Sequence, residues 1–171
     1  MFQSELRISK ERVAILVGKK GEIRKLIEKR TNTKIKISRE GDVTISGEDN
    51  LNIFITISIV KAIGRGFNPH IAMTLWNEAN ALEIINIKDI VGDSEKKLQR
   101  VRARSIGAEG KVRKYLEKIT NTSISIYGKT ISIIGKIEDV HTAKLAIEKL
   151  IRGSEHGNVY KYIEKQKQRL Q

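Results

Sequence analysis

Three short segments early in the chain alternate hydrophobic with polar residues, which predicts three β-strands that each have one buried face. In the second segment, Ile35 and Ile37 alternate with Lys34 and Lys36. Between and after these segments, apolar residues recur at intervals of three and four, the spacing of amphipathic helices. The predicted strands are residues 3–9, 34–37 and 42–46, and the predicted helices are residues 10–17, 22–31 and 49–64.

The segment 49–64 is the least clear of these elements, because its many β-branched residues also suit a strand. We interpret it as a helix because residues 139–151, at the corresponding place later in the chain, have clear helical spacing. Apolar residues lie nearly all round the segment, so we expect burial on more than one side, including against a second domain. Solvent exposure of Phe54 or Ile57 would contradict that expectation.

An internal repeat sets the domain organisation of the chain. Residues 18–38 (GKKGEIRKLIEKRTNTKIKIS) recur without a gap at residues 107–127 (GAEGKVRKYLEKITNTSISIY), and 11 of the 21 positions are identical. Each copy predicts a Gly-x-x-Gly turn, a basic helix, a left-handed cap residue at Asn32 or Asn121, and a half-buried strand. One structural unit therefore occurs twice.

The second copy follows the same order as the first: strand, helix, glycine turn, helix, strand, strand, helix. A tight turn at Gly128 and Lys129 joins its last two strands, so they pair as a hairpin. We therefore predict an α+β fold in which each copy is a three-stranded antiparallel sheet with three helices on one face. The elements expected in the second copy are residues 82–88, 95–105, 111–120, 123–127, 130–134 and 138–151.

A short helical connector is expected between the two copies. Asn68 suits the cap position before a helix, and Pro69 suits its first turn, where no amide hydrogen is needed. His70, Met73 and Trp76 are expected to pack between the domains. The resulting division is a first domain of residues 1–66, a connector of residues 67–81, a second domain of residues 82–153, and a C-terminal helical tail of residues 154–171 that frays at its end.

Positive charge is concentrated around the two glycine turns. The chain of 171 residues has a net charge of +13, and residues 7–39 alone carry 12 basic and 3 acidic side chains, a charge of +9. Residues 96–118 carry 9 basic and 2 acidic side chains, a charge of +7. One such run is usually a solvated helix face. Two runs at matched places indicate a site for a polyanion, with nucleic acid favoured over an anionic membrane surface.

Other features of the composition favour a cytoplasmic protein without a membrane segment. The chain has no cysteine, which fits a reducing compartment. Its N-terminus lacks the pattern of a signal peptide, and its most apolar stretch, residues 51–63, is too short to span a bilayer. The three histidines are scattered and the acidic residues are dispersed, so we expect no metal site, no cofactor and no catalytic residue.

Two motifs in each copy resemble the KH domain of the eukaryotic type, over nearly the whole chain. They are the glycine turns VGKKG (17–21) and IGAEG (106–110), and the strand entries TNTKI (31–35) and TNTSI (120–124). The segments ISIYGKTISIIG (124–135) and GSEHGNVYKYIE (153–164) resemble, more narrowly, archaeal KH proteins related to the eukaryotic pre-rRNA processing factor called Dim-two or partner-of-Nob-one. The resemblance implies two tandem type I KH domains.

This resemblance also implies a function in ribosome maturation. It implies binding of the 3′ region of small-subunit rRNA as a single strand, work beside the Nob-one endonuclease, and contact with the alpha subunit of initiation factor two. Two departures from the wider KH pattern concern the RNA site. Arg24 and Arg113 stand where that pattern has an apolar residue, and Ala108 and Glu109 replace the two lysines of the first turn.

A glycine turn before a helix suits the backbone of a nucleic acid. Glycine has no Cβ, so a phosphate can approach closely, and the helix dipole favours an anion at that end. The bases are expected to lie over aliphatic residues, because only 5% of the residues are aromatic. The candidate RNA-binding residues are Val17, Gly18, Lys19, Lys20, Gly21, Ile23, Arg24, Lys25, Lys34, Ile35, Lys36 and Arg39 in the first copy, and Arg102, Arg104, Gly107, Ala108, Glu109, Gly110, Lys111, Arg113 and Lys114 in the second.

The two copies are not expected to bind RNA equally. Glu109 stands where a phosphate would approach, so we predict that the first turn, with Lys19 and Lys20, is the stronger clamp. The rival interpretation is a basic scaffold that recruits translation or rRNA-processing factors through their acidic surfaces. RNA binding with weak salt dependence would favour the scaffold, because phosphate contacts release counterions.

Overall fold

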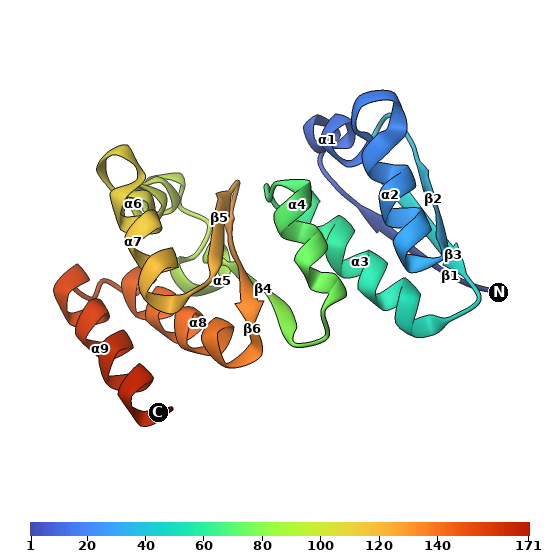
Figure 1. The fold of residues 1–171 in the computed structure, drawn as a ribbon. Helices are drawn as coiled ribbons and strands as arrows, with labels where there is room; N and C mark the ends of the chain where they lie inside the picture. Colours follow the sequence, from blue (N-terminus) through green and yellow to red (C-terminus); the bar gives the residue numbers. More distant parts are fainter. The chain divides into compact units, whose positions relative to one another are not determined.

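Each half of the chain forms a three-stranded antiparallel sheet in which the last strand in sequence lies in the middle (Figure 1). The computed structural model describes residues 1–171 and divides them into two units, Met1–Glu78 and Ala79–Gln171. The segments expected as a connector and a tail form no unit of their own in this division. In each unit helices cover one face of the sheet, which confirms the predicted α+β fold.

In the first unit the strands lie in the order β1-β3-β2, so β2 is an edge strand. Ile35 is paired with Ile45, and Leu6 with Val43, so apolar residues share one face across the sheet. The elements are β1 (Phe2–Arg7), the 3-10 turn η1 (Lys10–Arg12), α1 (Val13–Val17), the 3-10 turn η2 (Lys19–Gly21), α2 (Glu22–Thr31), β2 (Thr33–Ile37), β3 (Asp42–Gly47), α3 (Asn50–Gly64), α4 (Pro69–Ala72) and the 3-10 turn η3 (Met73–Trp76).

Helix α3 confirms the helical interpretation of its β-branched sequence, whereas the burial expected on more than one side holds for only part of its length. Asp49 caps its first turn by accepting a hydrogen bond from the Leu51 amide at 2.8 Å. Phe54 is 67% exposed and Leu51 is 51% exposed, so the first half of the helix is not buried all round. One stripe at intervals of three and four is buried along the helix and contains Ile53, Thr56, Ile59, Val60 and Ile63. The helix also packs against α4 and η3, and Ala62, which lies off that stripe, is fully buried.

The second unit repeats this arrangement, with its strands in the order β4-β6-β5. Ile124 is paired with Ile133, and Ile85 with Ile131, and all four are buried in one core. The elements are β4 (Asn80–Asn86), α5 (Ile87–Val91), α6 (Glu95–Ile106), the 3-10 turn η4 (Ala108–Gly110), α7 (Lys111–Thr120), β5 (Ser123–Tyr127), β6 (Thr130–Lys136), α8 (Ile137–Ile151) and α9 (His156–Arg169).

The short helix α5 has no counterpart in the first unit and was not predicted. The sequence indicated a strand that continued to Lys88, but the strand ends at Asn86. The Asn86 side chain accepts a hydrogen bond from the Lys88 amide at 3.1 Å and so begins the helix. Gly92, with φ of 81°, ends it one turn later. A one-turn helix is too short to produce a periodic pattern, which explains why the sequence did not reveal it.

The C-terminal helix α9 packs against the second unit. Val159 is 1% exposed and Ile163 is fully buried. The Tyr160 ring lies edge-on to the ring of Tyr115 on α7, with centroids 4.6 Å apart. Burial, and to a smaller extent the neighbouring Tyr115, raise the pKa of the Tyr160 hydroxyl above its ordinary value. Residues predicted as a tail therefore complete the core of this unit.

Candidate nucleic-acid interface

The first glycine loop (residues 18–21) and the second glycine loop (residues 107–110) have the same backbone conformation, although their middle residues differ. Lys20 has φ of 53°, and Glu109, at the same position of the second loop, has φ of 55°. A side chain in this left-handed region costs about 1–2 kcal/mol. Strain held at one position in both copies marks the loop as a candidate functional site.

The first glycine of each loop is required by close packing. Gly18 has φ of 74°, and a Cβ added to it would lie 2.9 Å from Ile23 Cβ. A Cβ added to Gly107, with φ of 72°, would lie 2.9 Å from Val112 Cβ. Both distances are too short for a real Cβ contact, so any larger residue would push the loop away from the helix that follows it.

The helix after each loop has an N-terminus without a side-chain cap. Gly21 precedes α2 and Gly110 precedes α7, and neither provides a capping hydrogen bond. The helix dipole places partial positive charge at such an end, where backbone amides can bind an anion. Lys19 and Lys20 are exposed in the first loop and add two full charges there. The geometry therefore suits a phosphate group.

Two further cations reach the first loop from α2. A Cβ added to Gly21 would lie 3.8 Å from Lys25 Cε and 3.9 Å from Nη2 of Arg24, so both side chains lie beside the second glycine. The Nε atom of Arg24 is buried and has no hydrogen-bond partner. Four basic side chains thus surround one turn of backbone. We call these the first-loop cations: Lys19, Lys20, Arg24 and Lys25.

In the second unit a carboxylate holds the equivalent arginine. Nη1 of Arg113 lies 3.1 Å from both carboxylate oxygens of Glu117, as an ion pair between successive turns of α7. A guanidinium group that is already paired has less capacity for a phosphate. The two loops therefore differ in that a carboxylate pairs with the guanidinium of Arg113 but not with that of Arg24.

A glutamate in each unit also joins the helix after the loop to the edge strand. Glu28 Oε1 accepts a hydrogen bond from the Ile35 amide at 2.8 Å, and Glu117 Oε1 accepts one from the Ile124 amide at 2.8 Å. These bonds hold α2 beside β2, and α7 beside β5. Sequence reasoning missed both residues, although their identity in the two copies of the repeat was a signal that could have found them.

Strand β2 positions its predicted contact residues differently from expectation. Ile35 is only 2% exposed, so its predicted contact with a base is wrong, because the side chain packs in the core under α2. Lys34 and Lys36 are exposed and point to the opposite face of the strand from Ile35. Lys34 lines one pocket with Lys25, one of the first-loop cations, whereas Lys36 does not line that pocket. Arg39 lies exposed in the turn between β2 and β3.

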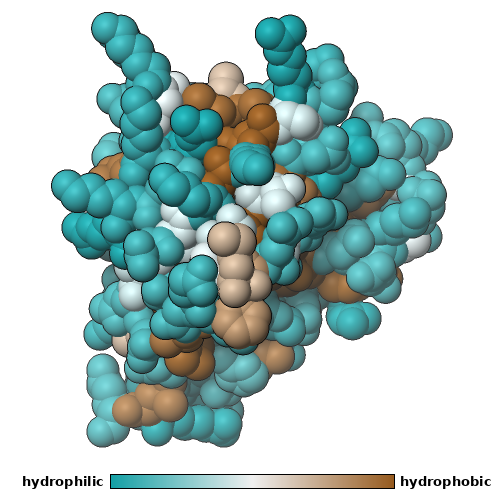
Figure 2. Space-filling view, turned by 90° about the vertical axis from the view of Figure 1, so that its right-hand side faces the viewer, coloured by the Kyte–Doolittle hydropathy of each residue, from teal (hydrophilic) through white to brown (hydrophobic).

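The apolar part of the first interface is small. Val17 and Ile23 are half-buried beside the first glycine loop. Figure 2 shows a largely hydrophilic face, with hydrophobic surface at the height of the loop between α1 and α2 and hydrophilic side chains that project past it. Bases held here would lie over aliphatic groups rather than aromatic rings.

Arg104, a predicted RNA contact, has a structural role in this fold that reduces its capacity for a phosphate. Its guanidinium donates hydrogen bonds to the carbonyl oxygens of Leu150 at 2.8 Å and Ser154 at 2.7 Å. The Leu150 carbonyl also accepts a hydrogen bond from the Gly153 amide at 3.1 Å, so Arg104 adds a second donor at the end of α8. The other candidates of the second copy are exposed at its loop or on the adjoining helices: Arg102, Ala108, Glu109, Lys111 and Lys114.

The structure lacks the features that define two other functional classes, a metal centre and a membrane span. No group of three or more His, Cys, Asp or Glu side chains is placed to hold a metal ion. No helix has the length and apolar composition needed to cross a membrane.

Comparison with known proteins identifies the family. Residues 81–168 match the sequence profile of the eukaryotic type (type I) KH domain, and residues 3–58 match that of the KH domain. A KH domain-containing protein of Methanocaldococcus jannaschii is 43% identical over 169 residues, which cover 96% of this chain and 74% of that protein. The chain therefore belongs to the KH-domain family.

Within this family the chain is similar to Dim2p and PNO1 proteins. The solved a/eIF2alpha–aDim2p–rRNA complex from Pyrococcus horikoshii contains a chain that is 48% identical, with a TM-score of 0.90, over 98% of this chain and 94% of that one. The pre-rRNA-processing protein PNO1 of Gibberella zeae is 28% identical over 141 residues, which cover 80% of this chain and 49% of that protein. The chain thus spans about half of this fungal relative.

Proposed function

We propose that this protein binds single-stranded RNA through its glycine loops and acts in the maturation of small-subunit rRNA. The observation that carries the proposal is the first glycine loop, where four cations surround an uncapped helix N-terminus. Phosphates of a bent strand suit this arrangement because backbone amides, the helix dipole and mobile lysines all favour negative charge. Binding without catalysis accounts for these features.

The first loop is proposed as the stronger clamp. It has Lys19 and Lys20 where the second loop has an alanine and Glu109, and its Arg24 is not held by a carboxylate. Glu109 would repel a phosphate at the distance of a contact. The second loop would still attract RNA through the uncapped end of α7 and through Lys111 and Lys114 nearby.

The comparisons support the choice of RNA and partner. The similar chain from Pyrococcus horikoshii was solved in complex with rRNA and with a/eIF2alpha, and the fungal relative is a pre-rRNA-processing protein. We propose the same two partners for this chain: the 3′ region of small-subunit rRNA, and the alpha subunit of initiation factor two. Cooperation with the Nob-one endonuclease is a further proposal that follows from the family resemblance.

Fluorescence anisotropy would test the clamp. The intact protein would be titrated against a labelled single strand that matches the 3′ end of small-subunit rRNA, with duplex RNA and a scrambled strand as controls. The double variant Lys19→Asp/Lys20→Asp is expected to weaken binding at least tenfold and to reduce the dependence of log Kd on log salt. The matched control is Lys161→Asp/Lys165→Asp, which changes charge equally at exposed positions of α9.

Two outcomes would contradict the proposal. Equal loss of affinity in both double variants would mean that total charge, and not the loop, binds RNA. Weak binding to single-stranded, scrambled and duplex RNA alike, with little effect of salt, would favour the basic scaffold that recruits proteins.

A further inference from the structure

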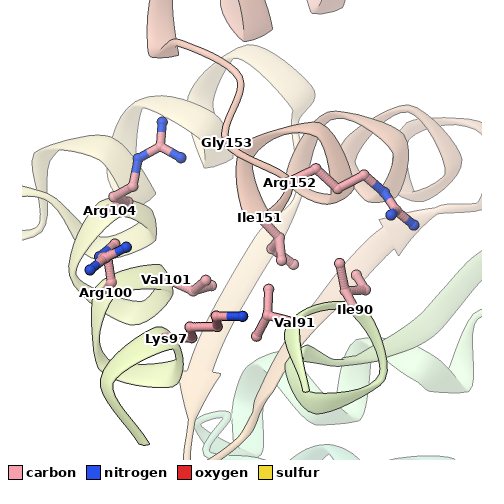
Figure 3. A pocket seen from close by; sticks show the side chains of 9 residues that line it. All are labelled: Ile90, Val91, Lys97, Arg100, Val101, Arg104, Ile151, Arg152 and Gly153. Carbon is pink, nitrogen blue, oxygen red and sulfur yellow. The ribbon is translucent and has the colours of Figure 1, made fainter. Parts of the chain in front are cut away.

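A pocket in the second unit lies between α5, α6 and the end of α8, apart from the glycine loop (Figure 3). Its volume is about 520 Å³. Figure 3 shows Val91, Val101 and Ile151 pointing toward one another from these three elements, so the floor is aliphatic. The pocket exists only in this unit, because α5 supplies one wall and has no counterpart in the first copy.

Three exposed cations surround this aliphatic floor. Lys97 and Arg100 extend from α6, and Arg152 extends from the end of α8. No carboxylate lines the pocket. By contrast, the pocket beside α2 in the first unit includes Glu28 and Glu48 among its lysines. The pocket by α5 therefore combines an apolar centre with an uncompensated positive rim.

The two rim cations of α6, Lys97 and Arg100, lie on a different side of that helix from Arg102, the RNA candidate on α6. Lys97, Arg100 and Arg104 recur at intervals of three and four and lie on one stripe, whereas Arg102 lies on another side of the helix. The guanidinium of Arg104 is already bound to carbonyl oxygens at the end of α8. The free charge of the rim is thus separate from the proposed phosphate clamp.

We propose that this pocket binds a segment of a protein partner in which acidic residues flank an aliphatic side chain. The aliphatic side chain would fill the floor, and its flanking carboxylates would pair with Lys97, Arg100 and Arg152 at the rim. An RNA strand fits less well, because the aliphatic floor offers no polar side chain to the edge of a base.

A designed peptide would test this proposal on the intact protein. The probe is a fluorescein-labelled peptide with one central leucine flanked on both sides by glutamates. Two control peptides replace the glutamates by glutamine, or the leucine by alanine. Saturable anisotropy is expected for the first peptide, with backbone amide shifts in NMR spectra confined to residues near α5, the pocket face of α6 and the end of α8. Both control peptides are expected to bind more weakly.

Charge variants separate the pocket from general attraction to a basic protein. Arg100→Glu/Arg152→Glu is expected to weaken the first peptide roughly tenfold, because two rim pairs are replaced by repulsion. The matched control, Lys161→Glu/Lys165→Glu on exposed positions of α9, is expected to change peptide binding less than twofold. Both charge variants lower the net charge equally and so weaken RNA binding to some extent. The affinity of Arg100→Glu/Arg152→Glu for the single-stranded RNA is expected to stay within about twofold of that of the α9 control.

The opposite results would overturn the proposal. No saturable binding of the peptide, or equal weakening in both charge variants, would exclude a specific acidic partner at this pocket. RNA-induced shifts at the pocket, together with loss of RNA affinity in Arg100→Glu/Arg152→Glu alone, would assign the pocket to the RNA path instead. Failure of RNA binding at the glycine loops would leave these peptide results unaffected, since the two sites use different residues.

Discussion

Arg104 donates a hydrogen bond to the carbonyl oxygen of Leu150 at 2.8 Å, and thereby fixes α6 to the end of α8. In the first unit Arg12 binds the carbonyl oxygens of Ile63 at 2.7 Å and Phe67 at 2.9 Å, at the end of α3. Burial there lowers the pKa of Arg12 from its ordinary value, although the guanidinium stays charged. In each unit, therefore, an arginine binds the carbonyl oxygens at the C-terminal end of one helix, α3 in the first unit and α8 in the second. We call these two arginines the guanidinium caps.

Replacement of Arg104 by alanine is expected to destabilise the second unit without a loss of RNA affinity. Two charge-assisted bonds to carbonyls disappear, so the free energy of unfolding should fall by about 2–3 kcal/mol. Arg102→Ala, on the same helix but exposed, should change stability by less than about 0.5 kcal/mol. Chemical denaturation and anisotropy would be measured on both. If Arg104→Ala folds with unchanged stability but loses RNA affinity, Arg104 contacts RNA, as the sequence predicted.

Glu109 controls both strain and charge in the second glycine loop. Glu109→Gly is expected to stabilise the unit by about 0.5–1 kcal/mol, because glycine adopts positive φ without strain but loses more chain entropy on folding. Glu109→Lys keeps the strain and reverses the charge, so it should leave stability nearly unchanged and tighten single-stranded RNA binding. Urea denaturation and anisotropy would separate the two effects. Unchanged RNA affinity in Glu109→Lys would mean that the second loop does not contact phosphate.

Glu28 is expected to stabilise the first unit through its bond to the edge strand. Glu28→Ala leaves the Ile35 amide without its partner, at a cost of about 1–3 kcal/mol. Glu28→Gln keeps a side-chain oxygen that can accept this bond, so it should retain most of the stability. The comparison is made by denaturant unfolding of the intact protein, with circular dichroism as the signal. Similar losses in both variants would show that the negative charge, and not the hydrogen bond, is the stabilising feature.

Asp93 should titrate below the ordinary range of an aspartate. Lys88 lowers the pKa of Asp93 most, through a hydrogen bond and its charge, with its Nζ 3.2 Å from Oδ2 of Asp93. The charge of Lys129 lowers it further, with Nζ 3.6 Å from Oδ1. The pairs therefore stabilise the folded unit above the ordinary pKa of aspartate, and this contribution is lost as the pH falls through the lowered value. The effect on stability is small, because all three groups are exposed.

A carboxyl NMR titration would measure that pKa directly. Lys88→Met is expected to raise the pKa of Asp93 toward its usual value, because the largest favourable interaction is removed. Lys161→Met, on exposed α9, is the control and should leave it unchanged. An Asp93 that titrates normally in the unchanged protein would show that the two lysines do not hold it in solution.

The sequence by itself determined the repeat, the fold class and the position of the glycine loops. It also located the left-handed caps, which the structure confirms at Asn32 and Asn121 with φ of 52° and 54°. Apart from the repeat, these signals are local. They depend on the spacing of apolar residues within one element, or on the backbone freedom of glycine and asparagine within one turn.

Tertiary structure decided which side chains are available for binding. Alternation predicted that Ile35 faces inward, and the same residue was also expected to contact a base. The packing of α2 over β2 decides between these two expectations, because it leaves Ile35 only 2% exposed. Likewise, Arg24 and Arg113 occupy the same position in the repeat and differ in whether a carboxylate engages them.

The two guanidinium caps show the same limit most clearly. Arg12 lies six residues before Gly18, whereas Arg104 lies three residues before Gly107, so an alignment of the copies does not match them. Each binds carbonyls that are 46 to 55 residues away along the chain. Spacing within a helix determines which face a residue occupies, but the partner on that face is set by how distant elements pack together.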